Sequence, residues 1–229
     1  MILTGRILGY GVAVRPVGSP VVYTMIGPEK SLVNLETMGR EAARWKATAA
    51  NYRKDMSLGP DVVRRATFAD DAFATLAENL RIGLTDMVVA QASDGQVIGL
   101  MNYGYPETTT AMIYLLVVDP VNLSGTPGRG QLRGIGTGLV ATASRIFLER
   151  GLGQVNIHPL DDGAAAFWKG RGFQQCGVGN NLCIRGRQAI EALIGDCTTR
   201  PDKPDGGEVV ICGLPQRVEA MRVPAARSR

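Results

Sequence analysis

Apolar positions near the N-terminus follow first a strand pattern and then a helix pattern. Residues 5–17 and 20–26 are rich in strand-forming side chains and meet at Gly18-Ser19, which predicts two strands. Over residues 34–56 apolar side chains recur every three or four positions, which predicts one amphipathic helix. Leu58-Gly59-Pro60 ends that helix.

Strand and helix patterns alternate through the rest of the chain, which predicts a mixed α/β sheet without internal repeats. We expect strands at residues 61–67, 87–92, 97–105, 111–119, 154–158, 173–177 and 181–185. The strand at 111–119 reads as buried on both faces, and Asp94-Gly95 predicts a hairpin before it. We expect helices at residues 70–82, 137–150 and 163–170.

The ends of the chain differ from its middle, which suggests three parts. Residues 1–60 predict an N-terminal extension of two strands and a helix that packs on a domain at residues 61–196. Residues 197–229 are rich in Pro, Gly and charge and have too little apolar surface to offset the entropy of ordering, so we expect a mostly flexible tail. The net charge of +4 divides into +4, −2 and +2 over these parts.

Composition excludes several classes of protein. The longest apolar run, residues 111–118, is far short of the roughly 20 residues of a membrane-spanning helix. Charges and glycines interrupt the N-terminal apolar stretch, which is not typical of a signal peptide. The four cysteines form no CxxC pair and there is one histidine, so we expect no metal site, free thiols and a cytoplasmic location.

A glycine-rich loop carries the clearest chemical signal. Residues 131–138 read QLRGIGTG, between a buried strand and a helix. Glycines allow backbone N–H groups to converge at the helix N-terminus, which suits a phosphate or pyrophosphate. The loop lacks the Gly-Lys-Ser/Thr of a Walker motif, and it follows antiparallel strands rather than the first strand of a dinucleotide fold.

This loop and a second motif resemble a known family. The QxxGxG of residues 131–136 follows a strand ending Val117-Val118-Asp119-Pro120, and residues 161–173 read DDGAAAFWKGRGF. Together with VVRRATFADD at residues 62–71, they resemble the GCN5-related N-acetyltransferase (GNAT) superfamily over residues 61–186. The resemblance implies a single domain whose mostly antiparallel sheet is splayed at an acyl-CoA site. It also implies transfer of acetyl from acetyl-CoA to a primary amine by direct attack on the thioester.

The resemblance also assigns cofactor-binding residues. It implies that the pantetheine arm pairs with the backbone of Leu116, Val117 and Val118. The pyrophosphate would be held by Arg133, Gly134, Ile135, Gly136, Thr137 and Gly138, with side-chain help from Gln131 or Arg133. Asp161 and Phe167 would flank the thiol.

Three features depart from the family pattern. Trp168 stands where the family usually has the tyrosine that protonates the leaving thiolate, so Tyr103, Tyr105 and Tyr114 become candidates, with strand packing as the alternative. Residues 121–130 lengthen the segment before the loop, and we expect an exposed flexible insertion there. Between the first two core strands, at 61–67 and 87–92, there is room for one helix, whereas the family commonly has two. In the family these helices shape the acceptor pocket, so we expect residues 1–60 to contribute to that pocket here.

Three side chains are candidates for the general base. His158 ends a strand beside the expected thioester and has an unperturbed pKa near neutral pH, with ordinary solvation as the alternative. Glu107 and Asp119 lie at strand ends where an amine could approach, although carboxylates are common on surfaces.

Two functions therefore remain open at this stage. The first is an acyltransferase whose acceptor is a small molecule, peptide, protein or aminoacyl-tRNA. The second, suggested by Trp168, is a non-catalytic CoA-binding regulatory or interaction module. The arginine clusters lack the interleaved aromatics of a nucleic-acid site, so no nucleic-acid partner beyond such a tRNA is expected, and the oligomeric state stays open, a homodimer included.

Overall fold

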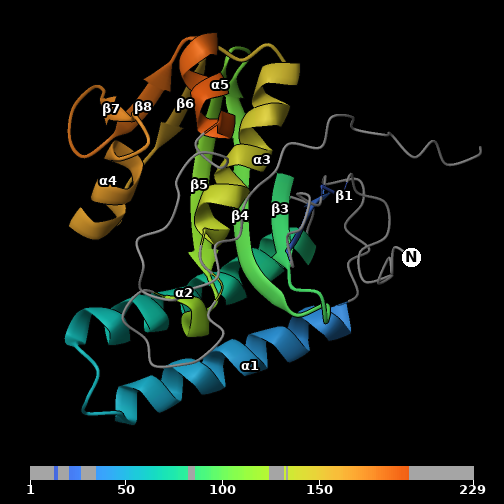
Figure 1. Ribbon diagram of the computed structural model, residues 1–229, viewed down its shortest axis with the longest axis vertical. Coiled ribbons are helices and arrows are strands. Elements are labelled where there is room, and N and C mark those ends of the chain that lie inside the picture. The colour runs from blue at the N-terminus through green and yellow to red at the C-terminus, as the bar shows by residue number, and fades with distance from the viewer. Residues whose placement is uncertain are drawn as a thin grey trace, which may run out of the picture.

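The computed structural model describes residues 13–14, 21–26, 35–81, 86–123, 132 and 134–195. They form one eight-stranded sheet in the order β1-β2-β3-β4-β5-β6-β8-β7 (Figure 1). The strands are β1 (Ala13–Val14), β2 (Val22–Ile26), β3 (Asp86–Gln91), β4 (Val97–Glu107), β5 (Thr110–Val118), β6 (Gln154–Ile157), β7 (Gln174–Gln175) and β8 (Leu182–Arg185). The helices are α1 (Leu35–Lys54), α2 (Pro60–Arg81), the short 3-10 helix η2 (Pro120–Asn122), α3 (Ile135–Glu149), α4 (Asp162–Lys169) and α5 (Arg187–Gly195).

The alternation of strand direction is interrupted at one place among the described residues. Every neighbouring pair is antiparallel except β5 and β6, which run parallel. A parallel pair needs a long crossover, and α3 supplies it. The expected mixed, mostly antiparallel α/β sheet is confirmed, as is the hairpin at Asp94-Gly95, where Gly95 has a φ of 87°.

Each face of the sheet is covered by its own helices. One core packs α3 and α5 on the sheet around Leu139, Phe147 and Ile190. The other packs α1 and α2 on the sheet around Trp45, Phe73 and Leu100. In Figure 1, α1 and α2 run together along the bottom, and α4 lies beside β6, β8 and β7. The sheet is therefore buried between two helical layers.

The expected strand at residues 61–67 is wrong, because these residues open helix α2. Pro60 stands at the first helical position, where its fixed φ suits the helix. Val62, Ala66, Ala69 and Phe73 are buried at spacings of three and four, so the helical period extends back through the supposed strand.

This correction changes the interpretation of the first 60 residues. The helix expected at 34–56 is confirmed as α1. In chain order, both α1 and α2 come after β2 and before β3. Since β2 pairs with β3 along its length, residues 22–26 belong to the same sheet as the rest of the fold. The prediction of one helix in place of two is therefore wrong.

Several other expectations are corrected or lie outside the described residues. Burial of β5 on both faces is wrong at Tyr114, whose side chain is 49% exposed. Most of the first expected strand, the loop at 124–131 with Gln131, the residue Arg133 and the tail from 196 onward are not among the described residues. Within the described part of the chain, no helix combines the length and the apolar character needed to cross a membrane.

Close approach of α3 to the sheet depends on two glycines. A Cβ on Gly138 would overlap the hydroxyl and ring of Tyr23, a buried side chain on β2. A Cβ on Gly99 of β4 would lie 2.7 Å from the Cγ2 of Ile135. These positions set how near the N-terminal half of α3 lies to the sheet.

We predict that Gly138→Ala lowers the free energy of unfolding by about 1–3 kcal/mol, because the buried Tyr23 ring must move. Gly39→Ala is the matched control, since Gly39 is exposed on α1 with nothing within 4 Å of its Cβ position. It should raise the free energy of unfolding by about 0.5–1 kcal/mol through helix propensity. Urea denaturation measures both, and an unchanged Gly138→Ala protein would contradict the packing.

Candidate functional site

The two parallel strands separate partway along their length. Ile113 of β5 and Ile157 of β6 form the last of four parallel pairs, whereas β5 continues to Val118. Beyond Ile113, the described residues give β5 a paired strand on its β4 side only. We call residues 114–118 of β5, together with His158 after β6, the fork. Leu116, Val117 and Val118, the expected pantetheine-binding residues, all lie in it.

Tyr114 begins the fork in a β-bulge. Tyr103 of β4 pairs with Ile113 and Asn102 pairs with Leu115, so Tyr114 is an extra residue between them. Its ring lies over Gly104 of β4, where a Cβ would come within 2.9 Å of the ring. Tyr114 is half-exposed and follows the last parallel pair, while its ring and hydroxyl lie over β4.

The glycine-rich loop reaches the fork through the first turn of α3. Gly134 is the N-cap residue with a left-handed φ of 77°, and it has no side chain with which to cap the helix. A Cβ on Gly136 would lie 3.4 Å from Phe167 of α4 and 3.5 Å from Leu116 of β5. Three of the expected cofactor-binding segments, on β5, α3 and α4, therefore meet at Gly136.

The two ends of the segment before this loop are also tied together. The backbone N–H of Leu132 donates to the side-chain oxygen of Asn122 over 2.8 Å. Asn122 belongs to η2, which follows the end of β5 directly. Gly134 and α3 therefore start close to the end of the strand that carries the fork.

Arg171 is a residue beside this site that sequence reasoning missed. Its guanidinium lies over the Phe167 ring, with the Cζ atom 3.5 Å from the ring centroid. It donates to the Phe167 carbonyl over 2.8 Å and to the Thr137 hydroxyl on the first turn of α3. The signal in the sequence was a cation within the DDGAAAFWKGRGF motif, but the motif does not show which way that side chain turns.

Gly138 and Asp161, two expected cofactor residues, have clear structural roles. Gly138 makes room for Tyr23, as described above. The Asp161 carboxylate caps α4 by accepting from the Ala164 N–H over 2.8 Å, and it lies 3.1 Å from the Arg64 guanidinium of α2. Capping and ion pairing account for Asp161 without a ligand.

Trp168, which the resemblance aligns with a general-acid position, is a core residue. Its side chain is 6% exposed, and its ring centroid lies 5.1 Å from that of Phe173 and 5.0 Å from that of Phe167. An indole packed in this way supplies apolar surface rather than a proton. Trp168 orients Phe167 at the site.

Among the tyrosine candidates, only Tyr114 lies in the fork. Tyr103 is buried against Phe147, and burial raises its pKa far above the ordinary value. Tyr105 lies under Arg150 after the C-terminal end of α3, and burial raises its pKa to about 12. Their contacts therefore lie at the opposite end of α3 from the glycine-rich loop.

The base candidates are also separated by the structure. His158 directly follows Ile157, as Tyr114 follows Ile113, so both residues come immediately after the last parallel pair. Glu107 pairs with Thr110 and accepts from its hydroxyl, three residues before the last parallel pair, which is about 10 Å along the strand. Asp119 lies at the other end of β5. Of the three, only His158 stands where the strands separate.

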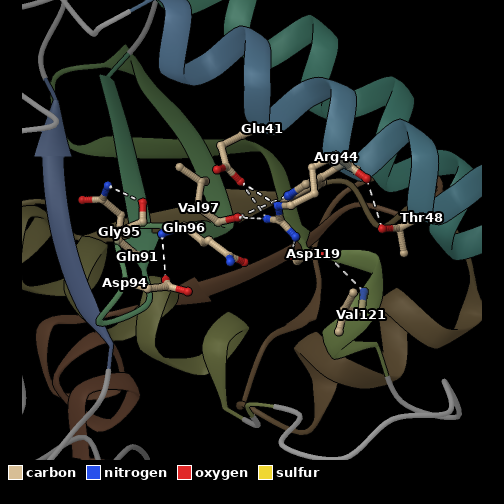
Figure 2. Close-up of polar contacts among 11 residues, drawn as sticks. Glu41, Arg44, Thr48, Gln91, Asp94, Gly95, Gln96, Val97, Asp119 and Val121 are labelled. Atoms are coloured by element: carbon tan, nitrogen blue, oxygen red, sulfur yellow. Dashed lines mark hydrogen bonds and ion pairs between the residues drawn. The ribbon is translucent and has the colours of Figure 1, made fainter.

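Asp119 is held in a buried polar cluster with α1 (Figure 2). It is 1% exposed, and its Oδ2 lies 2.5 Å from a guanidinium nitrogen of Arg44, while its Oδ1 accepts from the Val121 N–H. Arg44 also donates to Glu41 and to the Val97 carbonyl, each over 2.8 Å. Burial raises the pKa of Asp119, and the Arg44 charge opposes that rise. These contacts give Asp119 a structural role.

The described residues hold no other obvious reactive centre. No three His, Cys, Asp or Glu side chains among them gather as metal ligands would. Cys176 and Cys183 are free thiols, and burial raises the pKa of Cys176 to about 11.

Comparisons with known proteins give distant structural similarities. No protein-family model matches the sequence, and no curated protein matches it either. One solved structure is a mutant of the AtaT toxin bound to the C-terminus of the antitoxin AtaR and acetyl-CoA, and it is 20% identical to this chain. The alignment covers 56% of this chain and 84% of the toxin chain, with a TM-score of 0.44. A KacTA–DNA complex is 20% identical, covers 55% of this chain and 86% of its own, with a TM-score of 0.44.

A nourseothricin acetyltransferase is 19% identical and covers 44% of this chain and 65% of its own, with a TM-score of 0.37. These TM-scores are too low to carry an argument about function. We therefore base the proposed function on the residues of this chain.

We predict that Arg44→Met lowers the free energy of unfolding by about 3 kcal/mol, because it leaves the buried Asp119 carboxylate without its partner. Arg187→Met on α5 is the control, since both members of the Arg187–Glu191 pair are exposed, and it should change stability by less than about 0.5 kcal/mol. Urea denaturation compares the two. Equal effects would contradict a structural role for the buried pair.

Proposed function

We propose that the protein is an acyl-CoA-dependent N-acyltransferase of the GNAT superfamily, most simply one that moves acetyl from acetyl-CoA to a primary amine. The observation that carries this proposal is the meeting of Leu116, Gly136 and Phe167 at the fork. The edge of a strand can pair with the pantetheine amides, and a glycine-rich helix N-terminus can bind the pyrophosphate. An aromatic ring can pack on an apolar chain.

The glycine-rich turn supports the phosphate end of the proposed site. Gly134 adopts a left-handed conformation and, as a glycine at the N-cap, has no side chain of its own to cap α3. The first N–H groups of a helix have no intrahelical partners and favour an anion. In this proposal the amides of Gly134, Ile135 and Gly136 hold the pyrophosphate, and Arg171 adds positive charge beside them.

The reacting end of the proposed site lies where the parallel pairing ends. An amine approaching from this end would attack the thioester carbonyl, and much of the rate would come from holding the two groups in line. His158 is the proposed proton acceptor for the amine. Tyr114 is the proposed proton donor for the leaving thiolate, because the family's usual tyrosine position holds the packed Trp168.

A non-catalytic CoA-binding module is the second candidate, and the core position of Trp168 favours it. The two candidates are separated by assaying thiol release from acetyl-CoA with a panel of amines, including small amines, peptides and aminoacyl-tRNA. Turnover on any acceptor supports the transferase. Tight acetyl-CoA binding without turnover on any of them supports the module.

We predict that Gly134→Asp weakens acetyl-CoA binding at least tenfold, because the negative charge of a carboxylate at the N-cap would repel the pyrophosphate. Gly134→Asn is the matched control, since asparagine has the same shape and also tolerates a left-handed φ but carries no charge. It should bind within about threefold of the original protein, a difference of less than one hydrogen bond. Isothermal titration calorimetry measures both dissociation constants, and equal weakening by the two variants would argue against an anion site.

We also predict that Tyr114→Phe lowers kcat about tenfold or more without changing the dissociation constant of acetyl-CoA, because it removes the proposed proton donor. Tyr105→Phe removes a hydroxyl at the opposite end of α3 and should leave kcat unchanged. Steady-state thiol release compares them. An unchanged kcat in Tyr114→Phe would show that Tyr114 is not the proton donor.

A further inference from the structure

A hydrogen bond joins His158, after β6, to the hairpin between β7 and β8. The Nδ1 of His158 lies 2.8 Å from the Oδ1 of Asn181. Asn181 precedes β8, which pairs antiparallel with β6. The partner of the histidine therefore comes from an element 23 residues away in sequence.

The orientation of the Asn181 amide follows from its second contact. Its Nδ2 donates to the carbonyl of Val178 over 3.3 Å, which leaves Oδ1 facing the imidazole. An amide oxygen has lone pairs and no proton, so the His158 Nδ1 must carry the hydrogen of this bond. In a neutral imidazole only one nitrogen carries a hydrogen, so Nε2 then keeps its lone pair.

The hairpin holds Asn181 from its backbone as well. The Cys176 N–H donates to the Asn181 carbonyl over 3.0 Å, and Gln175 pairs with Leu182. Gly177 and Gly179 take left-handed φ values of 78° and 82°, which permit the tight turn between them. The amide is thus positioned before any ligand binds.

We infer that Asn181 is a positioning residue that holds His158 as the Nδ1–H tautomer, so that Nε2 is the proton acceptor for the incoming amine. This inference rests on the proposed function. An ammonium acceptor loses one proton to Nε2, and its nitrogen forms the new C–N bond to the acyl carbon. The C–S bond breaks, its electron pair goes to sulfur, and the second proton of the nitrogen ends on the thiolate.

The surrounding elements carry other titratable groups that belong in any account of pH dependence. They include Tyr114 on β5, Asp161 and Asp162 at the start of α4, Cys176 in the hairpin, and Cys183 and Arg185 on β8. The Asp161 carboxylate is bound to the Ala164 N–H and to Arg64.

The tautomer can be tested without any turnover, because His158 is the one histidine of the chain. In protein made without a histidine tag, two-bond ¹⁵N–¹H correlation spectra assign both ring nitrogens directly. We expect the Nδ1–H form to dominate above the pH at which the ring titrates. Asn181→Ala should convert it to a mixture of tautomers, whereas Gln175→Ala should not.

Gln175→Ala is a matched control because Gln175 lies in the same hairpin and donates to the Gly179 carbonyl over 3.1 Å. It removes a similar side-chain bond without touching the histidine. A wild-type protein dominated by the Nε2–H form would overturn the inference. So would an Asn181→Ala spectrum identical to that of the wild type.

Kinetics then test the role of Nε2. His158→Ala should lower kcat about 100-fold with an unchanged dissociation constant for acetyl-CoA, as expected for loss of a general base. Asn181→Ala should lower kcat about fivefold, the value of one ordinary hydrogen bond, and Gln175→Ala should not change it. Equal decreases of kcat in Asn181→Ala and Gln175→Ala would show that Asn181 only stabilises the hairpin.

Asn181→Asp adds a readout that a purely structural role would not move. A carboxylate beside the ring stabilises the imidazolium, so the acid limb of the kcat–pH profile should shift upward by about one unit. An unshifted limb would show that His158 does not control the rate. If no amine accepts an acyl group from acetyl-CoA, the proposed function fails, while the NMR result still decides whether Asn181 fixes the ring.

Discussion

The ion pair between Arg44 and Asp119 joins the parts of the structure on which the site depends. Arg44 belongs to α1, Asp119 follows β5, and the guanidinium also contacts the carbonyl of Val97 at the start of β4. Two charges largely removed from water stabilise a fold only when the geometry satisfies both, and this guanidinium has three bonded partners and the carboxylate two. The pair therefore fixes α1 against the end of the sheet where β5 stops and the turn into η2 begins.

The candidate site forms because β5 continues beyond its parallel pairing with β6. Among the described residues, the part of β5 after Ile113 pairs only with β4, because β6 is short and enters as a parallel strand after α3. The bulge at Tyr114 marks the place where the two strands part, and His158 stands on the other side of it. Since α3 begins beside the far end of β5 and packs at Gly99 and Gly138, its N-terminal turn lies near both Leu116 of the fork and Phe167.

Sequence patterns predicted elements well wherever local spacing was sufficient. The helix now seen as α1, the Asp94-Gly95 hairpin and the helix after the glycine-rich loop all follow from periodicity and turn chemistry. The strand assigned to 61–67 was wrong because Val62 and Val63 suggest a strand locally, while the burial of Ala66, Ala69 and Phe73 against α1 and the sheet selects a helix. The same core holds α1 against α2 and the sheet, and β2 pairs with β3.

The sequence by itself determined the local conformations of the site, since glycines before a helix start and an aspartate before a short helix act through their nearest neighbours. Only the tertiary structure decided which polar side chains meet. Asp119 pairs with a residue 75 positions away, His158 with Asn181 and Arg171 with Thr137. Such contacts depend on strand order and register, which no local spacing encodes, so the structure gave Asp119 a structural role and left His158 at the fork.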